Sequence, residues 1–273
     1  MSYLKEFNIL KDKFDINRES INIDELFLQI HNLPFESFSY NILPGEEEYR
    51  CNEHNKTFKS SYNLEIKPDT PNLNRILNLD DSKIKENVTF NYSIFQSYKP
   101  EKEKPAKDKK KDKKVKKKKR KPKKIKSKGV IILLHGLNEK DWTKYLPWAK
   151  KLAESTHKTV ILFPIAFHMN RAPKEWLDPK FMISVNKERK KMRPNLSYSS
   201  FANAALSSRL QFYPQRFLWS GLQSYFDIIQ LIREIKSGYH PIISKNESIE
   251  LFAYSIGSFL ALILMMTNPY NYF

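Results

Sequence analysis

The chain has 273 residues, of which 40% are hydrophobic and 13% aromatic, so it can bury a core and a globally disordered protein is excluded. The net charge of +18 is concentrated in one tract, because residues 99–128 hold 19 Lys or Arg against 4 acids, a balance of +15, which leaves +3 for the remainder. The basic character therefore belongs to this tract and does not indicate a basic surface on the whole protein. The single cysteine, Cys51, excludes an intramolecular disulfide framework and favours a reducing compartment.

No apolar run is long enough for a signal peptide or a membrane span. The longest runs, Phe259–Met266 and Val130–Leu134, are too short to cross a bilayer. We therefore expect a cytoplasmic protein with no membrane span.

Residues 1–87 are predicted to form an N-terminal region of mixed helices and strands. Apolar residues at helical spacing favour helices at Tyr3–Asp15 and Ile23–His31. Alternation of apolar and polar residues predicts strands at Phe35–Ile42 and, more regularly, at Asn87–Phe95.

Residues 99–128 are predicted to be a disordered, Lys-rich insertion. The tract contains almost no apolar side chain, so it cannot bury surface to offset its ordering entropy, and its like charges repel. Two interpretations stay open. The one we favour is a low-complexity surface insertion. The other is a salt-sensitive site for nucleic acid or another anionic surface, which is less favoured because no aromatic residues are interleaved for base stacking.

A β-α-β unit follows the Lys-rich tract. Val130–Leu134 is wholly apolar and is typical of a strand covered on both faces. Trp142–His157 has helical spacing, and Thr159–Phe163 is a second buried strand that Pro164 ends. A strand, a helix and a strand at this spacing predict a mostly parallel sheet with flanking helices, which is an α/β fold.

The C-terminal part is predicted to contain a long irregular segment and two further helices. Residues 165–217 are polar and contain several prolines, so we interpret them as a lid or cap insertion. Ser220–Ser237 is a predicted helix that Ser220 could cap and Gly238 ends. The strand Ser248–Tyr254 and the apolar helix Gly257–Thr267 complete the pattern.

The motif that carries chemistry is Ala-Tyr-Ser-Ile-Gly at 253–257, between this last strand and this last helix. Small residues two positions either side of Ser255 are what a tight strand-to-helix turn requires, because larger side chains would collide with the neighbouring elements. Such a turn exposes the serine hydroxyl at the N-terminus of a helix. The backbone N–H groups and the helix dipole favour a developing anion there.

With His-Gly-Leu-Asn at 135–138, which also leaves a buried strand, this motif resembles the α/β-hydrolase superfamily, in particular a bacterial branch whose substrates are not established. The resemblance covers residues 88–273 and implies a partial α/β-hydrolase fold. It implies that Ser255 is the nucleophile and that the backbone N–H groups of Leu137 and Ile256 form the oxyanion hole. The implied substrate is a small ester, thioester or amide.

The resemblance is incomplete, because this superfamily takes its catalytic acid and then its histidine from later strands. Only 18 residues follow Ser255, and none is Asp, Glu or His. We therefore expect either a piece of a longer serine hydrolase or an inactive relative, with an open sheet edge and an uncovered apolar helix. A non-catalytic protein of the same fold and polyanion binding through the Lys-rich tract remain alternatives.

Other candidate residues are weaker. His135 is expected to be structural, since it can bond loop backbone. His168, Asn170 and Arg171 follow a strand at the face where α/β sheets bind ligands, so they are candidates for substrate binding, although a loop-packing cluster is the simpler interpretation. Cys51 and His54 form a single pair where zinc needs four ligands, so no metal or other cofactor is expected.

Overall fold

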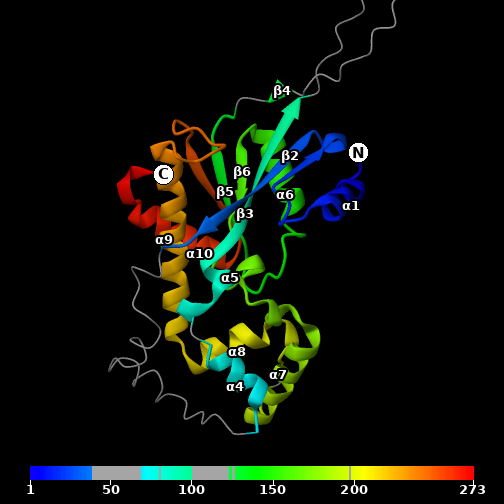
Figure 1. Ribbon diagram of the computed structural model, residues 1–273, viewed down its shortest axis with the longest axis vertical. Helices are drawn as coiled ribbons and strands as arrows, with labels where there is room; N and C mark the ends of the chain where they lie inside the picture. Colours follow the sequence, from blue (N-terminus) through cyan, green and yellow to red (C-terminus); the bar gives the residue numbers. More distant parts are fainter. Residues whose placement is uncertain (39–68, 80, 100–122, 125–126, 197) are drawn as a thin grey trace, which may run out of the picture.

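The computed structural model describes residues 1–38, 69–79, 81–99, 123–124, 127–196 and 198–273 (Figure 1). The predictions for Cys51 and His54, and most of those for the Lys-rich tract and for Phe35–Ile42, lie outside these residues. The centre is one seven-stranded sheet, with the order β1-β2-β3-β6-β5-β7 and with β4 paired to β3. The strands are β1 (Ser20–Ile23), β2 (Leu28–Glu36), β3 (Thr89–Lys99), β4 (Lys123–Lys124), β5 (Val130–Leu134), β6 (Thr159–Leu162) and β7 (Ile249–Ala253).

The sheet is mixed, so the prediction of a mostly parallel sheet is wrong. Parallel pairing is confined to β6-β5-β7, as the β-α-β pattern predicts. The pairs β1–β2, β2–β3, β3–β4 and β3–β6 are antiparallel. The strands of residues 1–36 thus belong to the same sheet as β5 and β7. This long-range pairing cannot be derived from local periodicity, which reports only which residues of a strand face the core.

Helices cover both faces of the sheet. One apolar cluster joins one face to α1 (Tyr3–Lys13) and α6 (Leu146–Thr156), and a second joins the other face to α9 (Gln215–Ser237) and α10 (Ile256–Thr267). Every residue of β5 is buried, and alternate residues of β5 contribute to the two clusters. This arrangement confirms the prediction of a strand covered on both faces.

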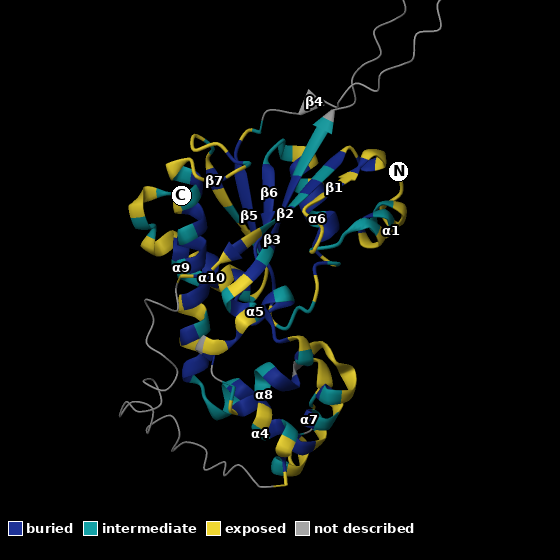
Figure 2. Ribbon diagram, in the orientation of Figure 1, coloured by how far each residue is buried: buried dark blue, intermediate teal, exposed yellow. Residues whose placement is uncertain are grey.

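A group of helices lies beyond the end of the sheet and encloses a third apolar cluster (Figures 1 and 2). Its main members are α4 (Pro71–Leu77), α7 (Pro179–Met192) and α8 (Ala204–Phe212), and we call them the helical cap. The cap therefore combines a helix from the first third of the chain with two from the segment between β6 and α9. The shorter elements are α5 (Lys85–Val88), η1 (Asp24–Leu26), η3 (Asp81–Lys83), η4 (Met169–Arg171), η5 (Lys174–Leu177), η6 (Phe201–Asn203) and η7 (Pro269–Asn271).

Three local predictions are corrected here. Residues 165–217 are largely helical, because Pro179 occupies the first turn of α7, where a missing N–H costs nothing, and Asp178 caps the helix by accepting from the Lys180 N–H at 2.9 Å. Helix α9 begins at Gln215, so Ser220 does not cap it. Ile23–His31 is mainly strand, because its alternate residues pack under α1 and α6.

The β7 side of the sheet is exposed in the part of the chain that the structure describes. β5 is the partner of β7, and the outward face of α10 is apolar, with Phe259, Leu262, Met265 and Met266 between 51% and 77% exposed. The expected open edge and uncovered helix are therefore confirmed for the described residues. None of the helices in these ranges combines the length and apolar character that crossing a bilayer requires.

Candidate functional site

Ser255 occupies a tight turn between β7 and α10. Its backbone angles are φ 57° and ψ −121°, a conformation that residues with a side chain rarely adopt and that is typical of strained functional turns. Around it, the Gly257 N–H donates to the Tyr254 carbonyl at 3.1 Å and the Ser258 N–H donates to the Ser255 carbonyl at 2.9 Å. The Ser255 side chain is exposed and does not cap α10, so the hydroxyl is presented to solvent.

Gly257 allows this turn to approach the end of β5. A Cβ atom at Gly257 would lie 2.7 Å from the His135 carbonyl oxygen and 2.8 Å from that of Leu134. The Tyr254 N–H donates to the same Leu134 oxygen at 3.0 Å. The Ser255 turn and the loop that leaves β5 are therefore in van der Waals contact, and only glycine permits it.

The loop that leaves β5 is held rigidly by buried hydrogen bonds. The ring of His135 donates from Nδ1 to the Gly136 carbonyl at 2.8 Å and accepts from the Ile165 N–H at Nε2, at 2.9 Å. The Gly136 N–H donates to the Tyr145 hydroxyl, which donates to Glu139, both at 2.8 Å. Both nitrogens of His135 are thus bonded to backbone groups, so His135 is structural and neutral.

The backbone N–H groups of Leu137 and Ile256 are the two that the resemblance implies as oxyanion donors. Leu137 is the second residue beyond His135, and Ile256 is the first residue of α10, a position whose N–H has no partner within the helix. Neither N–H donates to a backbone carbonyl among the residues that the structure describes. Neither group is therefore engaged by another part of the described backbone.

An apolar pocket of about 390 Å³ adjoins the two N–H groups. Leu137 and Ile256 are in its wall, together with Phe259 of α10, Leu206 and Leu210 of the cap, and residues of α9. Among the described residues its wall contains no Asp, Glu, Lys or Arg. Its volume falls in the range of small-molecule sites, which are mostly apolar with few polar groups.

His168 is the one histidine of the pocket wall. Its Nδ1 donates to the Ala166 carbonyl at 2.8 Å, so Nε2 carries the lone pair. This Nε2 is buried and has no hydrogen-bond partner among the described residues. Burial lowers the pKa of His168 to about 4. Burial, together with the nearby His168, also holds the pKa of His135 well below its usual range. Both rings are uncharged at neutral pH.

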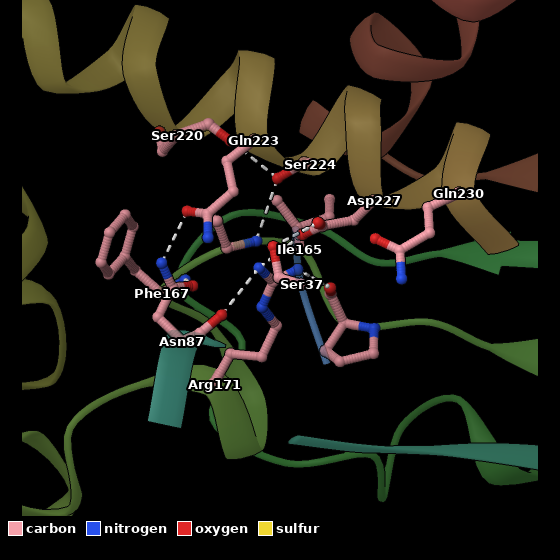
Figure 3. A network of polar contacts seen from close by, with 12 residues as sticks. Ser37, Asn87, Ile165, Phe167, Arg171, Ser220, Gln223, Ser224, Asp227 and Gln230 are labelled. Atoms are coloured by element: carbon pink, nitrogen blue, oxygen red, sulfur yellow. Dashed lines mark hydrogen bonds and ion pairs between the residues drawn. The ribbon is translucent and has the colours of Figure 1, made fainter. Parts of the chain in front are cut away.

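Arg171 and Asn170 have structural contacts and do not line the pocket. Arg171 is fully buried, and its guanidinium donates to the carboxylate of Asp227 at 2.7 Å and to the carbonyls of Pro164 and Asn87 at 3.0 and 3.1 Å (Figure 3). The Asn170 side chain donates to the Asn91 carbonyl at 2.7 Å. The simpler interpretation of both residues, loop packing, is the one that these contacts support.

The network around Asp227 positions the loop that follows β6. Asp227 of α9 also accepts from Ser37, and Asn87 donates to Gln223 of α9 at 2.6 Å. The Ala166 N–H donates to Ser224 at 3.0 Å. Figure 3 shows these side chains converging from α9, α5 and the loop. Sequence reasoning missed this network, although a single Asp within an apolar helical stretch was a usable signal.

In the part of the chain that the structure describes, no side chain that could serve as the base for Ser255 is bonded to it. Among the described residues, no hydrogen bond joins Ser255 to a histidine or a carboxylate, and no group of three or more His, Cys, Asp or Glu could hold a metal. The arrangement therefore comprises a strained exposed serine, two available N–H groups and an apolar pocket.

The comparisons with known proteins identify a family but no function. A family described as being of unknown function (DUF6051) matches residues 1–107 and 112–273. No curated protein and no solved structure matches the chain.

Proposed function

The chain belongs to the DUF6051 family of unknown function, and from this premise we propose that it is an α/β-hydrolase-like serine hydrolase that cleaves an ester, thioester or amide through an acyl-Ser255 intermediate. The observation that carries the proposal is the backbone of Ser255, at φ 57° and ψ −121°, between β7 and the first turn of α10. Such strain persists only where surrounding contacts enforce it, and it clusters at reacting groups.

The sheet order supports the same proposal. β5 lies between β6 and β7, and all three strands are parallel, so the loop after β5 and the turn after β7 leave the same edge side by side. In an α/β-hydrolase the loop after β5 and the turn after β7 must be adjacent, because each of them supplies one oxyanion donor. The antiparallel β3 also agrees with the early antiparallel strand that the resemblance implies.

The proposed reaction proceeds in two steps. The Ser255 oxygen attacks the acyl carbon, and the carbonyl oxygen becomes an anion that accepts from the N–H groups of Leu137 and Ile256. The carbon–heteroatom bond then breaks, the leaving group departs with a proton, and water later releases the acid from the acyl-serine. The serine proton needs a base, which the described residues around Ser255 do not supply.

A second candidate function follows from that observation. A protein without a base at Ser255 would bind an apolar ligand in the pocket and would not cleave it. The two functions differ in the reactivity of Ser255, because only an activated serine reacts with a fluorophosphonate.

The test is fluorophosphonate labelling of the full chain, followed by peptide mass mapping. The hydrolase function requires label on Ser255 in the unchanged protein and in Ser258→Ala, an exposed serine on the same helix, and no label in Ser255→Ala. If circular dichroism shows a folded protein and Ser255 stays unlabelled, the hydrolase is excluded and the binding function is favoured.

A further inference from the structure

Gly221 lies in the interior of a helix, and no close contact within the protein requires a glycine at this position. It lies at the end of the second turn of α9, and no atom is found within 4 Å of the position that its Cβ would take. Glycine destabilises a helix interior relative to alanine, and here it relieves no close contact. Gly221 is exposed and is part of the wall of the apolar pocket, and the position of its missing side chain is open space.

The hydroxyl groups in the pocket wall are already engaged with the protein, and the buried Nε2 of His168 is a single acceptor without a partner among the described residues. The hydroxyl of Ser224 donates to the Ser220 carbonyl at 2.8 Å, and the hydroxyls of Tyr225 and Thr267 are 3.0 Å apart. The Ser220 hydroxyl donates to Phe217 at 3.1 Å. A ligand would therefore find few free donors or acceptors, and a charged ligand would lose its hydration without compensation.

The pocket reaches the Ser255 turn at Ile256, and Ser255 itself is not part of the pocket wall. Leu137 and Ile256, whose N–H groups are available to an oxyanion, are also in the pocket wall. If the carbonyl oxygen of a substrate accepted from these N–H groups, the chain attached to that carbonyl would lie in the pocket. This position corresponds to the acyl side of a substrate.

We propose that the pocket holds an uncharged, apolar acyl chain of medium length and that Gly221 sets the length the pocket accepts. The proposal rests on the function proposed above, and it names the substrate class of the same site. A bulky side chain at position 221 would project into the pocket and leave room for short acyl groups only.

The experiment compares the labelling rates of Ser255 by a methyl and a dodecyl fluorophosphonate in the full chain. The unchanged protein is expected to prefer the dodecyl reagent by at least about tenfold, since each buried methylene contributes to discrimination. Gly221→Phe is expected to abolish this preference, because its rate with the dodecyl reagent falls relative to its rate with the methyl reagent. Arg233→Phe, an exposed position of the same helix outside the pocket, is the matched control and is expected to keep the preference.

The two proposals fail in different ways. An unchanged dodecyl preference in Gly221→Phe, or no preference in the unchanged protein, overturns the acyl-chain proposal and leaves the hydrolase standing. If neither reagent labels Ser255, the hydrolase fails and the pocket is tested by the fluorescence of the methyl ester of a dansyl-labelled undecanoic acid, which is uncharged. Binding that Gly221→Phe abolishes and Arg233→Phe does not would retain the apolar chain as ligand, and absence of binding would overturn it.

Discussion

At the scale of single residues, two glycines on the helices beside the pocket have opposite physical roles. Gly257 is required by contact, because a Cβ would lie 2.7 Å from a carbonyl oxygen, whereas the space around Gly221 is empty. The first glycine positions the Ser255 turn against β5, and the second leaves volume in the pocket.

Alanine substitutions at these two glycines are predicted to have effects of opposite sign. Gly257→Ala should reduce the free energy of unfolding by about 1–3 kcal/mol, because the methyl group forces the backbone apart. Gly221→Ala should raise it by about 0.5–1 kcal/mol, because alanine favours the helix. Urea unfolding of the two variants measures both, and a Gly257→Ala protein as stable as the unchanged chain would contradict the close approach.

The buried ion pair of Arg171 and Asp227 is a second residue-scale feature. Both side chains have no solvent exposure, and the Arg171 guanidinium carbon lies 4.0 Å from the centre of the Phe90 ring. A buried pair of this kind contributes little net stability by itself, but each charge depends strongly on the other.

Asp227→Ala is predicted to destabilise the protein by about 3–5 kcal/mol, because it leaves the Arg171 charge buried without its partner. The double variant Arg171→Met with Asp227→Leu removes both charges and should be more stable than Asp227→Ala. Denaturant midpoints of the three proteins measure the coupling. If the free energy of unfolding of Asp227→Ala lay within about 1 kcal/mol of that of the unchanged protein, the pair would not be tightly coupled.

At the scale of elements, the helical cap is anchored through the C-terminal end of α4. The last carbonyls of a helix lack partners within it. Here Arg216 donates to the carbonyls of Leu77 and Leu79 at 2.9 and 3.1 Å, and Arg209 donates to those of Ile76 and Leu79. Both arginines also pair with the buried carboxylate of Asp81. The segment predicted as a lid is thus a helical layer fixed by buried charges.

Arg216→Met is predicted to loosen the cap and to leave the sheet intact. The Leu77 carbonyl would lose its arginine donor and the Leu79 carbonyl would keep only Arg209. The amides of α4 and α8 should therefore exchange with deuterium faster by about tenfold or more, a loss of about 1.4 kcal/mol or more in local stability. Arg233→Met, on the exposed side of α9, is the control and should exchange like the unchanged protein. Equally fast exchange in β5 would mean that the cap and the sheet unfold as one unit.

At the scale of the whole molecule, buried histidines make stability depend on pH. Burial lowers the pKa values of His168 and of His240 to about 4, and that of His135 lies well below its usual range. In the unfolded chain each titrates near about 6.5. Below that pH the unfolded state binds more protons than the folded state, so acid favours unfolding.

The free energy of unfolding is therefore predicted to be constant above pH about 7 and to fall between pH about 6.5 and about 4. Each fully buried histidine contributes a slope of up to about 1.4 kcal/mol per pH unit. His168→Phe should reduce this slope by the contribution of one histidine. Urea unfolding at several pH values measures the slopes, and equal slopes in the two proteins would rule out the contribution of His168.

Two local sequence patterns predicted the parallel part of the sheet and the Ser255 turn. The apolar stretches at β5 and β6 and the helical pattern between them predict the parallel part of the sheet, because a strand buried on both faces needs apolar residues throughout. Small residues around Ser255 predict the tight turn, because the steric demand of such a turn is local. Proline was a less reliable signal, since Pro179 begins a helix inside the segment that was predicted to be irregular.

By itself the sequence determined the strands β3, β5, β6 and β7, the helices α1, α6, α9 and α10, and the position of the Ser255 turn, because each depends on neighbours within a few turns of chain. Only the tertiary structure decided that β2 pairs with β3, that α4 joins the cap and that Arg171 is buried against Asp227. These features depend on contacts between residues tens of positions apart or more. Such contacts are selected by the burial of whole surfaces, which periodicity and spacing along the chain do not encode.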